Sequence, residues 1–390
     1  MINNENKYMR VLSALGIIFI VSGHLGLSFF EINGLFPYYS FHVYIFLFVA
    51  GYFYSADSSA HAGKYILKKA KNLLIPYFIC NLIYGLINTY LNTRGFSFGG
   101  DISLYNLFAA PFFGGHQFML NAPSWFLISL FILETLNVLL RCLLKNIRLD
   151  ERSLELILFL VTLILGIIVI YLSIGGHIWG FRKDIARIII MYPGFMFGRI
   201  YRTWIEPETS AKFKSNVSKI LLSFGVMVSA VLIQLVIKCF AAGLAFSTVW
   251  VSGFASGPIV PYLTVITGIA FWLSVSKILV ILLSYNEITS AILENIMILG
   301  RHTKSIMLHH IFVFFVINTI LYGFNFKNGA FPLFDTTLYM SDVYYAYGSG
   351  SYPRFLWAYL LMGLLIPVLF AAGYGFIKTS IKNRINKDEK

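Results

Sequence analysis

Charged residues are scarce in this chain of 390 residues: they make up 12% of the sequence, while 58% is hydrophobic. Soluble domains carry roughly one quarter charged residues. Several apolar runs reach the roughly 20 residues that one membrane crossing needs. This balance excludes an ordinary soluble domain and predicts a polytopic membrane protein.

Cysteine is rare, and the sequence lacks the common soluble-enzyme motifs. Cys80, Cys142 and Cys239 lie in or beside apolar runs and follow no metal-ligand spacing, which predicts small buried hydrophobic residues without a disulfide framework. The chain contains no GxxxxGK[ST], HExxH, CxxC or GxSxG pattern. ATP-driven transport and metalloprotease chemistry are therefore disfavoured, and we expect neither a metal nor a bound cofactor.

The apolar runs define about ten candidate spans. Because the lipid core requires every backbone polar group to be paired within the protein, the spans should be helices, and the predicted fold is all-α. The predicted spans are 11–31, 37–56, 72–91, 122–143, 154–175, 185–202, 217–239, 257–275, 303–323 and 354–377. In the segment 278–300, Glu287 and Glu294 favour an interfacial helix over another span.

The distribution of basic residues sets the predicted topology. With both termini in the cytoplasm, most of the 30 Lys and Arg residues fall in inner loops, as the positive-inside rule requires. We expect a single transmembrane domain over 1–377 and a basic cytoplasmic tail over 378–390. The net charge of +13 does not indicate nucleic-acid binding, because the basic residues lie between apolar spans.

Two histidines lie deep in the first two spans. At about 1.5 Å per residue, His24 lies about 20 Å along the first span, and His42 lies about 8 Å below the outer face. The two rings should share one depth and line one outward-leaning cavity if the helices are neighbours. An imidazole exchanges a proton near neutral pH, which suits a general base. The alternative is a neutral ring that hydrogen-bonds between helices.

Other polar residues in the spans are weaker candidates. Glu134 could orient a histidine, relay protons or bond to a neighbouring helix. His310, about 9 Å from the inner side, suits a donor site, and the alternative is a hydrogen bond between helices. Trp125 could serve as an anchor in the aromatic belt at the membrane surface, and Arg187 could contact the interface or a sugar. The outer loops 92–121, with His116 in "PFFGGHQF", and 324–353 have a composition that suits a pocket roof or a sugar contact.

Five segments together resemble a known family. They are "SALGIIFIVSGH", "FHVYIFLFVAGYFY", "KKAKNLLIPYF", "SWFLISLFI" and "GRHTKSIMLHH", in this order. The chain resembles the acyltransferase type 3 family of bacterial inner-membrane enzymes, and in particular its fucose 4-O-acetylase-like branch. The resemblance covers most of the chain and is weakest between residues 205 and 290. It implies transfer of an acyl group, usually acetyl from acetyl-CoA, to a hydroxyl of a surface glycan.

The resemblance also implies roles for single residues. His24 matches the catalytic histidine, but the family's basic residue falls on Ser13. Arg10, one turn earlier, is the candidate substitute, and it would hold either donor phosphates or the helix end. His42 matches a second common histidine, and Gly51 a glycine for close helix packing. Lys69 and Lys71 match a basic pair that suits binding of the CoA phosphates. The alternative is that these two lysines only set the membrane topology. Trp125 and His310 match a "WFL" motif and a ninth-span histidine.

The expected function is therefore a membrane O-acetyltransferase that acts on O-antigen, capsule or exopolysaccharide. His24 serves as general base, with His42 or Glu134 as tuning groups. Acetyl-CoA is a co-substrate, and the expected partners are membrane lipid and a glycan or lipid-linked sugar. The main alternative is a transporter or flippase for a lipid-linked sugar that uses the same histidines for proton coupling.

Overall fold

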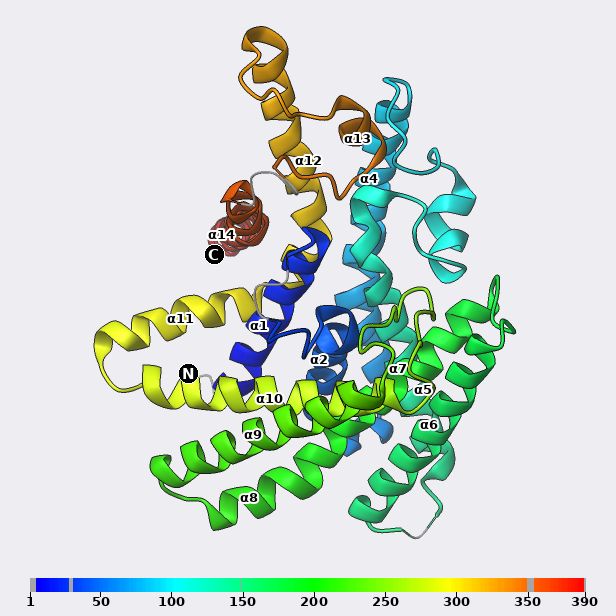
Figure 1. Ribbon diagram of the computed structural model, residues 1–390, viewed down its shortest axis with the longest axis vertical. Helices are drawn as coiled ribbons and strands as arrows, with labels where there is room; N and C mark the ends of the chain where they lie inside the picture. Colours follow the sequence, from blue (N-terminus) through cyan, green and yellow to red (C-terminus); the bar gives the residue numbers. More distant parts are fainter. Residues whose placement is uncertain (1–4, 28–30, 148, 349–353, 389–390) are drawn as a thin grey trace.

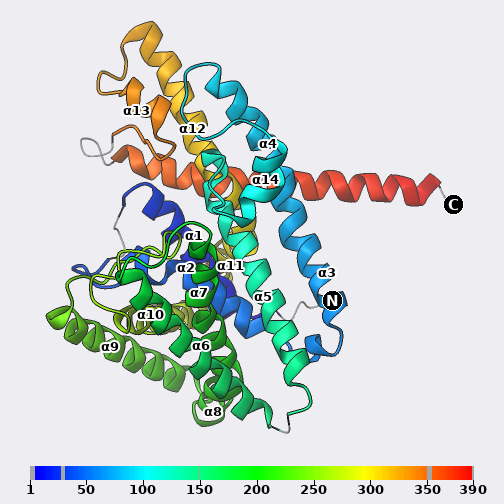
Figure 2. The same cartoon turned by 90° about the vertical axis from the view of Figure 1, so that its right-hand side faces the viewer.

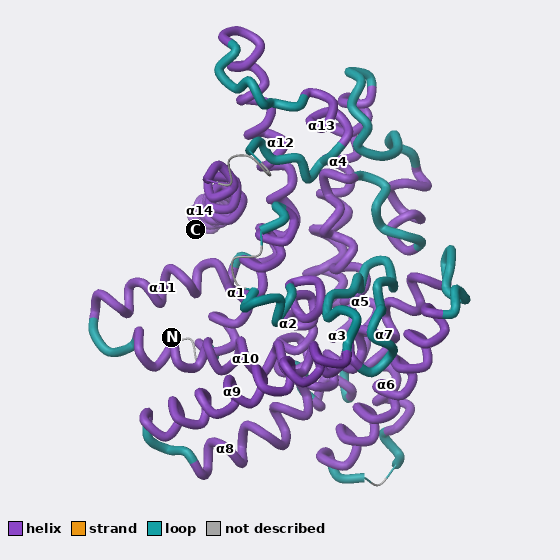
Figure 3. The backbone as a smooth tube through the Cα atoms, in the orientation of Figure 1, coloured by secondary structure: helices purple, strands orange, loops and turns teal. Residues whose placement is uncertain are grey.

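The computed structural model describes residues 5–27, 31–147, 149–348 and 354–388. The chain is 77% helical, and the described residues contain no strand (Figure 3). The all-α membrane fold predicted from the sequence is confirmed.

The helices of the first half differ greatly in length. They are α1 (Lys7–His24), α2 (Tyr38–Phe53), α3 (Ala62–Lys69), α4 (Ile75–Asn92), α5 (Trp125–Leu144), α6 (Glu151–Ile174) and α7 (Arg182–Ile200). Those of the second half are α8 (Glu206–Lys212), α9 (Asn216–Phe240), α10 (Val260–Leu283), α11 (Glu287–Arg301), α12 (Thr303–Asn328), α13 (Thr336–Ser341) and α14 (Arg354–Asp388).

Short segments of tighter or wider helix connect several of these elements. The π-helical segments are η2 (Ala70–Leu74), η3 (Tyr105–Ala109) and η6 (Tyr201–Ile205), and the 3₁₀ segments are η1 (Ala56–Ser59), η4 (Ala110–Phe112) and η5 (Met119–Ser124). The segment η2 joins α3 to α4 without a break, so the third span is one long helix over Ala62–Asn92. A π segment leaves backbone carbonyls without their usual helical partner.

Each predicted span overlaps a helix. The first, 11–31, overlaps α1, which ends at His24, and its residues 28–30 lie outside the described residues. Among the described residues, seven helices are long and apolar enough to cross a membrane: Ala62–Asn92, Met119–Leu144, Glu151–Ile174, Asn216–Phe240, Val260–Leu283, Thr303–Asn328 and Arg354–Gly375. The other three predicted spans are α1, α2 and α7. These three are shorter or carry more charge, and they occupy the interior of the bundle, where other helices replace lipid.

The inner and outer helices show opposite burial. The helix α2 packs against α1 and α7, and α10 packs against α1, α2 and α9 near the middle of the molecule (Figure 1). At the periphery, α6 and α9 expose large apolar side chains such as Ile164, Tyr171, Leu232 and Val236. Exposed leucine, isoleucine and valine along a whole helix indicate a lipid-facing surface.

Most of the segment 278–300, where the sequence predicts an interfacial helix, forms the helix α11, while residues 278–283 belong to α10. Leu293 and Met297 are buried against the chain, and Glu287 and Glu294 are exposed, so the helix is amphipathic. It packs along α1, and Arg301 at its end binds Glu294 on the same helix and Glu5 before α1.

Two arginines near the ends of predicted spans are buried. Arg141 of α5 and Arg199 of α7 both bind Glu155 of α6, at 2.6 and 2.8 Å, and all three side chains are 5% exposed or less. The carboxylate compensates both guanidinium groups, which would be costly to bury alone. The positive charge near these two span ends therefore belongs to a buried ion cluster.

Two smaller expectations are modified by the structure. Cys80 is buried and Cys142 is partly buried, but Cys239 is exposed, so the prediction of three buried thiols is wrong for Cys239. The predicted tail 378–390 begins inside α14, which continues as a helix to Asp388 and extends beyond the bundle (Figure 2).

Candidate functional site

His24 is the last residue of α1 and points toward α12. The side chain of Asn6 starts the helix by accepting the Met9 N–H, and Gly26, at φ 67°, lets the chain leave directly after His24. The Nδ1 atom of His24 lies 2.8 Å from the Nε2 atom of His310 on α12. The two rings are nearly parallel, with centroids 5.1 Å apart, and the ring of Tyr344 lies 5.1 Å from that of His24.

His42 on α2 lies beside the same site. Its Nδ1 atom donates to the backbone carbonyl of Tyr38, one turn earlier, and its ring meets that of Tyr39 edge to face at 5.4 Å. The hydroxyl of Tyr39 donates to the carbonyl of Gly23, which ties α2 to the end of α1. The two histidines therefore come from neighbouring helices, as the depth argument required.

A small cavity of about 70 Å³ separates the two rings from the outer loops. His24 and His42 both line this cavity, which we call the histidine cavity, and the prediction that they share one cavity is confirmed. Its other lining residues are Ile20, Tyr39, Val43, Phe46, Pro123, Trp125, Phe126, Ser247, Thr248, Val249 and Met307. The loop between α9 and α10 thus supplies part of its wall, which the sequence did not indicate.

A second cavity of about 520 Å³ adjoins it and carries the basic residues. We call it the donor cavity, after the sequence-based expectation that basic residues bind the acyl donor. It is lined by Lys68 and Lys69 of α3 and by Lys304 of α12. Phe46, Phe126 and Met307 line both cavities, so these three apolar side chains form the boundary between them. The amine of Lys304 donates to the carbonyl of Asn72 in η2 at 3.0 Å, where the π segment leaves the backbone available.

Glu134 lies on the donor side and not beside the histidines. Its carboxylate accepts from the Lys69 amine at 2.6 Å, and its side chain is 1% exposed. It does not line the histidine cavity. The sequence left three roles open for Glu134, and the structure shows one of them, a bond to a neighbouring helix.

The other residues expected at the donor site are distributed differently. Arg10 binds Glu5, which also accepts from Arg301 at 2.8 Å, and this bond lowers the pKa of Glu5 below its usual value. Lys71 is exposed and lines neither cavity. In place of Arg10 and Lys71, the wall of the donor cavity contains Lys68 and Lys304, which the sequence pattern did not single out.

His310 is placed behind His24 and outside the donor cavity. It is fully buried and lines neither cavity. The depth count had put it nearer the inner face. Its contact with His24 at 2.8 Å is set by how α12 packs against α1.

The outer side of the site is built from aromatic and cationic side chains. The Arg187 guanidinium lies 4.9 Å over the ring of Trp125 and donates at 2.7 Å to the carbonyl of Val249. The His116 ring stacks on that of Trp250 with centroids 4.9 Å apart, and burial lowers the pKa of His116. Trp250, half exposed, was not recognised in the sequence because it lies where the resemblance is weakest.

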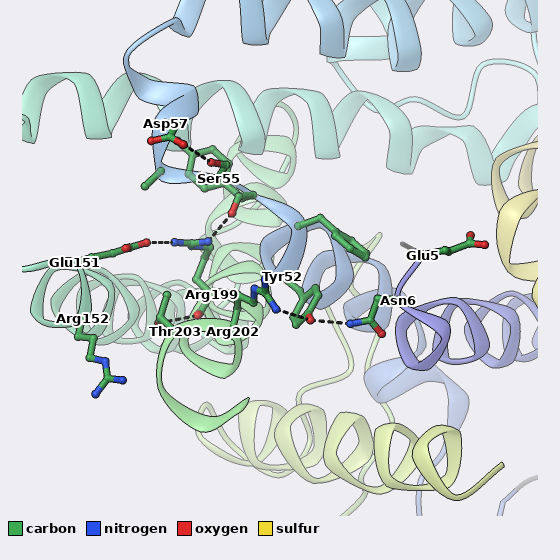
Figure 4. A pocket seen from close by; sticks show the side chains of 13 residues that line it. Glu5, Asn6, Tyr52, Ser55, Asp57, Glu151, Arg152, Arg199, Arg202 and Thr203 are labelled. Atoms are coloured by element: carbon green, nitrogen blue, oxygen red, sulfur yellow. Dashed lines mark hydrogen bonds and ion pairs between the residues drawn. The ribbon is translucent and has the colours of Figure 1, made fainter. Parts of the chain in front are cut away.

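A larger cavity of about 810 Å³ adjoins the donor cavity at Phe53 and Ser55 (Figure 4). Figure 4 shows Arg199 bound to Glu151, and Tyr52 between Asn6 and Arg202. Most of its charged groups are thus paired with one another. None of the residues that the sequence assigned to catalysis or substrate binding lines this cavity.

The geometry suits proton transfer at the two histidines of the histidine cavity. Each of the two histidines uses Nδ1 in a hydrogen bond, and among the described residues neither Nε2 atom has a hydrogen-bond partner. A basic nitrogen at the wall of a cavity can accept the proton of a hydroxyl that enters it. Within the described part of the chain, no cluster of His, Cys, Asp and Glu suits a metal ion.

Comparison with known proteins gives one finding. A family model described as an acyltransferase domain matches residues 6–372. The comparisons with curated proteins and with solved structures give no match.

Proposed function

The chain belongs to the acyltransferase type 3 family, and from this premise we propose that it is a membrane O-acetyltransferase that transfers acetyl from acetyl-CoA to a glycan hydroxyl. The observation that carries the proposal is the contact between two cavities. The histidine cavity and the donor cavity share Phe46, Phe126 and Met307, so a thioester held on one side lies next to a base on the other.

The donor cavity suits the anionic end of acyl-CoA. Lys68 is exposed, and Lys304 lies across the cavity on another helix. Ammonium groups bind phosphate oxygens through charge-assisted hydrogen bonds. We infer that the phosphates bind these lysines, and that the slender arm of the donor passes Phe46 and Met307 toward His24. The charge of Lys69 is already compensated by Glu134, so it contributes less.

The transfer follows from the position of the His24 Nε2 atom. This nitrogen takes the proton of the acceptor hydroxyl while the oxygen attacks the thioester carbonyl carbon. The carbon–sulfur bond then breaks, the thiolate leaves, and the proton on His24 passes to the sulfur. The products are an ester and free CoA thiol, and the histidine returns to its neutral form.

The outer aromatic residues suit the acceptor. Trp125 lines the histidine cavity, while Trp250 and His116 form a stacked pair above it. Sugar rings present C–H faces that pack on aromatic side chains, and Arg187 adds hydrogen-bond donors. A surface polysaccharide or its lipid-linked precursor at the outer face of a bacterial inner membrane is the acceptor that we propose.

Membranes that contain the wild-type protein or His24→Ala, incubated with isotopically labelled acetyl-CoA, test this proposal. We expect label in the glycan fraction with the wild type and not with the variant, and the mass of the glycan should rise by one acetyl group. Equal label in both preparations would remove His24 from the chemistry. Movement of a lipid-linked sugar without any acetyl transfer would support the transporter alternative.

A further inference from the structure

The proton positions at the histidine pair follow from one backbone contact. His310 is fully buried, and its Nδ1 atom lies 2.7 Å from the carbonyl oxygen of Ile306. A carbonyl oxygen only accepts, so the Nδ1 atom of His310 must carry hydrogen. Among the described residues no carboxylate pairs with either ring, and an uncompensated charge is costly in an apolar site. The resting ring is therefore neutral, with a lone pair on Nε2.

That lone pair determines the state of His24. The Nε2 atom of His310 lies 2.8 Å from the Nδ1 atom of His24, and two lone pairs cannot form a hydrogen bond. The Nδ1 atom of His24 must donate, which leaves its lone pair on Nε2. The chain of bonds thus runs from His24 through His310 to the carbonyl of Ile306.

We propose that His310 is a positioning residue that holds His24 in the tautomer with a basic Nε2 atom. In addition, it accepts from the imidazolium that forms when His24 takes a proton. This inference rests on the function proposed above, since it concerns the same base. A free imidazole exchanges between two tautomers, and only the one that His310 selects can serve as base through Nε2. The donor-binding role expected from the sequence is thereby replaced.

Substitutions at position 310 separate this role from simple packing. In His310→Gln the amide oxygen reaches the place of Nε2 and still accepts from His24. In His310→Asn the side chain is one bond shorter, so its amide reaches the Ile306 carbonyl but not the Nδ1 atom of His24. We expect His310→Leu and His310→Asn to lower kcat about 100-fold, within the roughly 10²–10⁴-fold worth of a general base. His310→Gln should recover most of that loss, and the KM for acetyl-CoA should stay unchanged in all three.

The neighbouring histidine provides a matched control. The Nδ1 atom of His309 lies 2.7 Å from the Tyr84 hydroxyl and makes no contact with His24. We expect His309→Leu to leave kcat and the fraction of folded protein near the wild-type values. Equal kcat in His310→Gln and His310→Leu would overturn the proposal. So would a raised KM for acetyl-CoA with unchanged kcat, which would return His310 to donor binding.

A second measurement does not depend on activity. Nitrogen-15 spectra of histidine-labelled protein distinguish protonated from bare ring nitrogens, and His24→Ala identifies the His24 signals. We expect a protonated Nδ1 and a bare Nε2 in the wild type, and a mixture of tautomers in His310→Leu. The same single tautomer in both proteins would overturn the proposal. If the wild type transfers no acetyl group, the proposed function fails, while the spectra still decide the role of His310.

Discussion

At the scale of single residues, Ser13 on α1 occupies the position where the resemblance led us to expect a basic side chain. Its hydroxyl donates to the Met9 carbonyl at 2.8 Å within the same helix, so it offers no charge. Arg10, the candidate substitute, is bound to Glu5 and faces α11. The cations of the donor cavity come instead from α3 and α12. The helix that carries His24 therefore contributes none of the lysines that line this cavity.

The first prediction concerns the two cavity histidines. Because His24 has a second histidine as hydrogen-bond acceptor and His42 only its own backbone, we expect His24→Gln to lower kcat by about 10²–10⁴-fold and His42→Gln to lower it less. Initial rates of acetyl transfer at saturating acetyl-CoA measure both. A larger loss for His42→Gln would make His42 the base.

The second prediction concerns the pair of Lys69 and Glu134. Removing one partner of a fully buried pair costs about 3–5 kcal/mol. Since the Lys69 side chain is 29% exposed, we expect a smaller but measurable loss of stability for Lys69→Met.

The matched control for this pair is the double variant Lys69→Met with Glu134→Leu. It removes the isolated carboxylate, so its melting temperature in detergent should exceed that of Lys69→Met alone. If the double variant loses as much stability as Lys69→Met and Glu134→Leu together, the two residues are not coupled, and this account is contradicted.

At the scale of elements, the position of His42 depends on how closely α2 approaches α7. A Cβ atom at Gly51 would overlap the backbone carbonyl of Phe195, and one at Gly198 would overlap that of Phe48. The two helices therefore meet backbone to backbone, as small residues permit in membrane bundles. This contact bears out the reading of Gly51 as a packing glycine and fixes α2 against the core.

The third prediction tests this contact. We expect Gly51→Ala and Gly198→Ala each to destabilise the protein by about 1–3 kcal/mol, the usual range for overpacking, and to lower the yield of folded protein. Gly225→Ala on α9 is the control, because nothing lies near its added Cβ atom. Thermal unfolding in detergent measures all three. Equal melting temperatures would mean that the helices move apart without cost.

At the scale of the whole molecule, the two cavities divide the work of the site. The basic donor cavity is formed by α3, α12 and the π segment between α3 and α4, while the histidine cavity is roofed by the loop between α9 and α10. Elements from both ends of the sequence meet at Phe46, Phe126 and Met307. An acyl group that enters from the donor cavity must pass this boundary to reach His24.

The fourth prediction is that a bulky residue at this boundary separates donor binding from transfer. We expect Met307→Trp to lower kcat strongly while the protein keeps its affinity for CoA, measured by calorimetry. Leu130→Phe is the control, because Leu130 lines the donor cavity without reaching the histidine cavity. Unchanged kcat in Met307→Trp would show that the acyl group reaches His24 by another passage.

The sequence by itself determined the helical membrane fold and the amphipathic character of α11, and it predicted one depth for His24 and His42. Hydrophobic length, helical rise and the cost of burying polar groups are local properties, and they can be read along the chain.

Only the tertiary structure decided which polar groups meet. Glu134 pairs with Lys69, His310 lies behind His24, and Arg141 and Arg199 share Glu155. Each of these contacts depends on how deep a helix begins and which way its face turns, and these are set by neighbouring helices. For example, His310 lies 2.8 Å from His24, although a count along its own span predicts a position nearer the inner face.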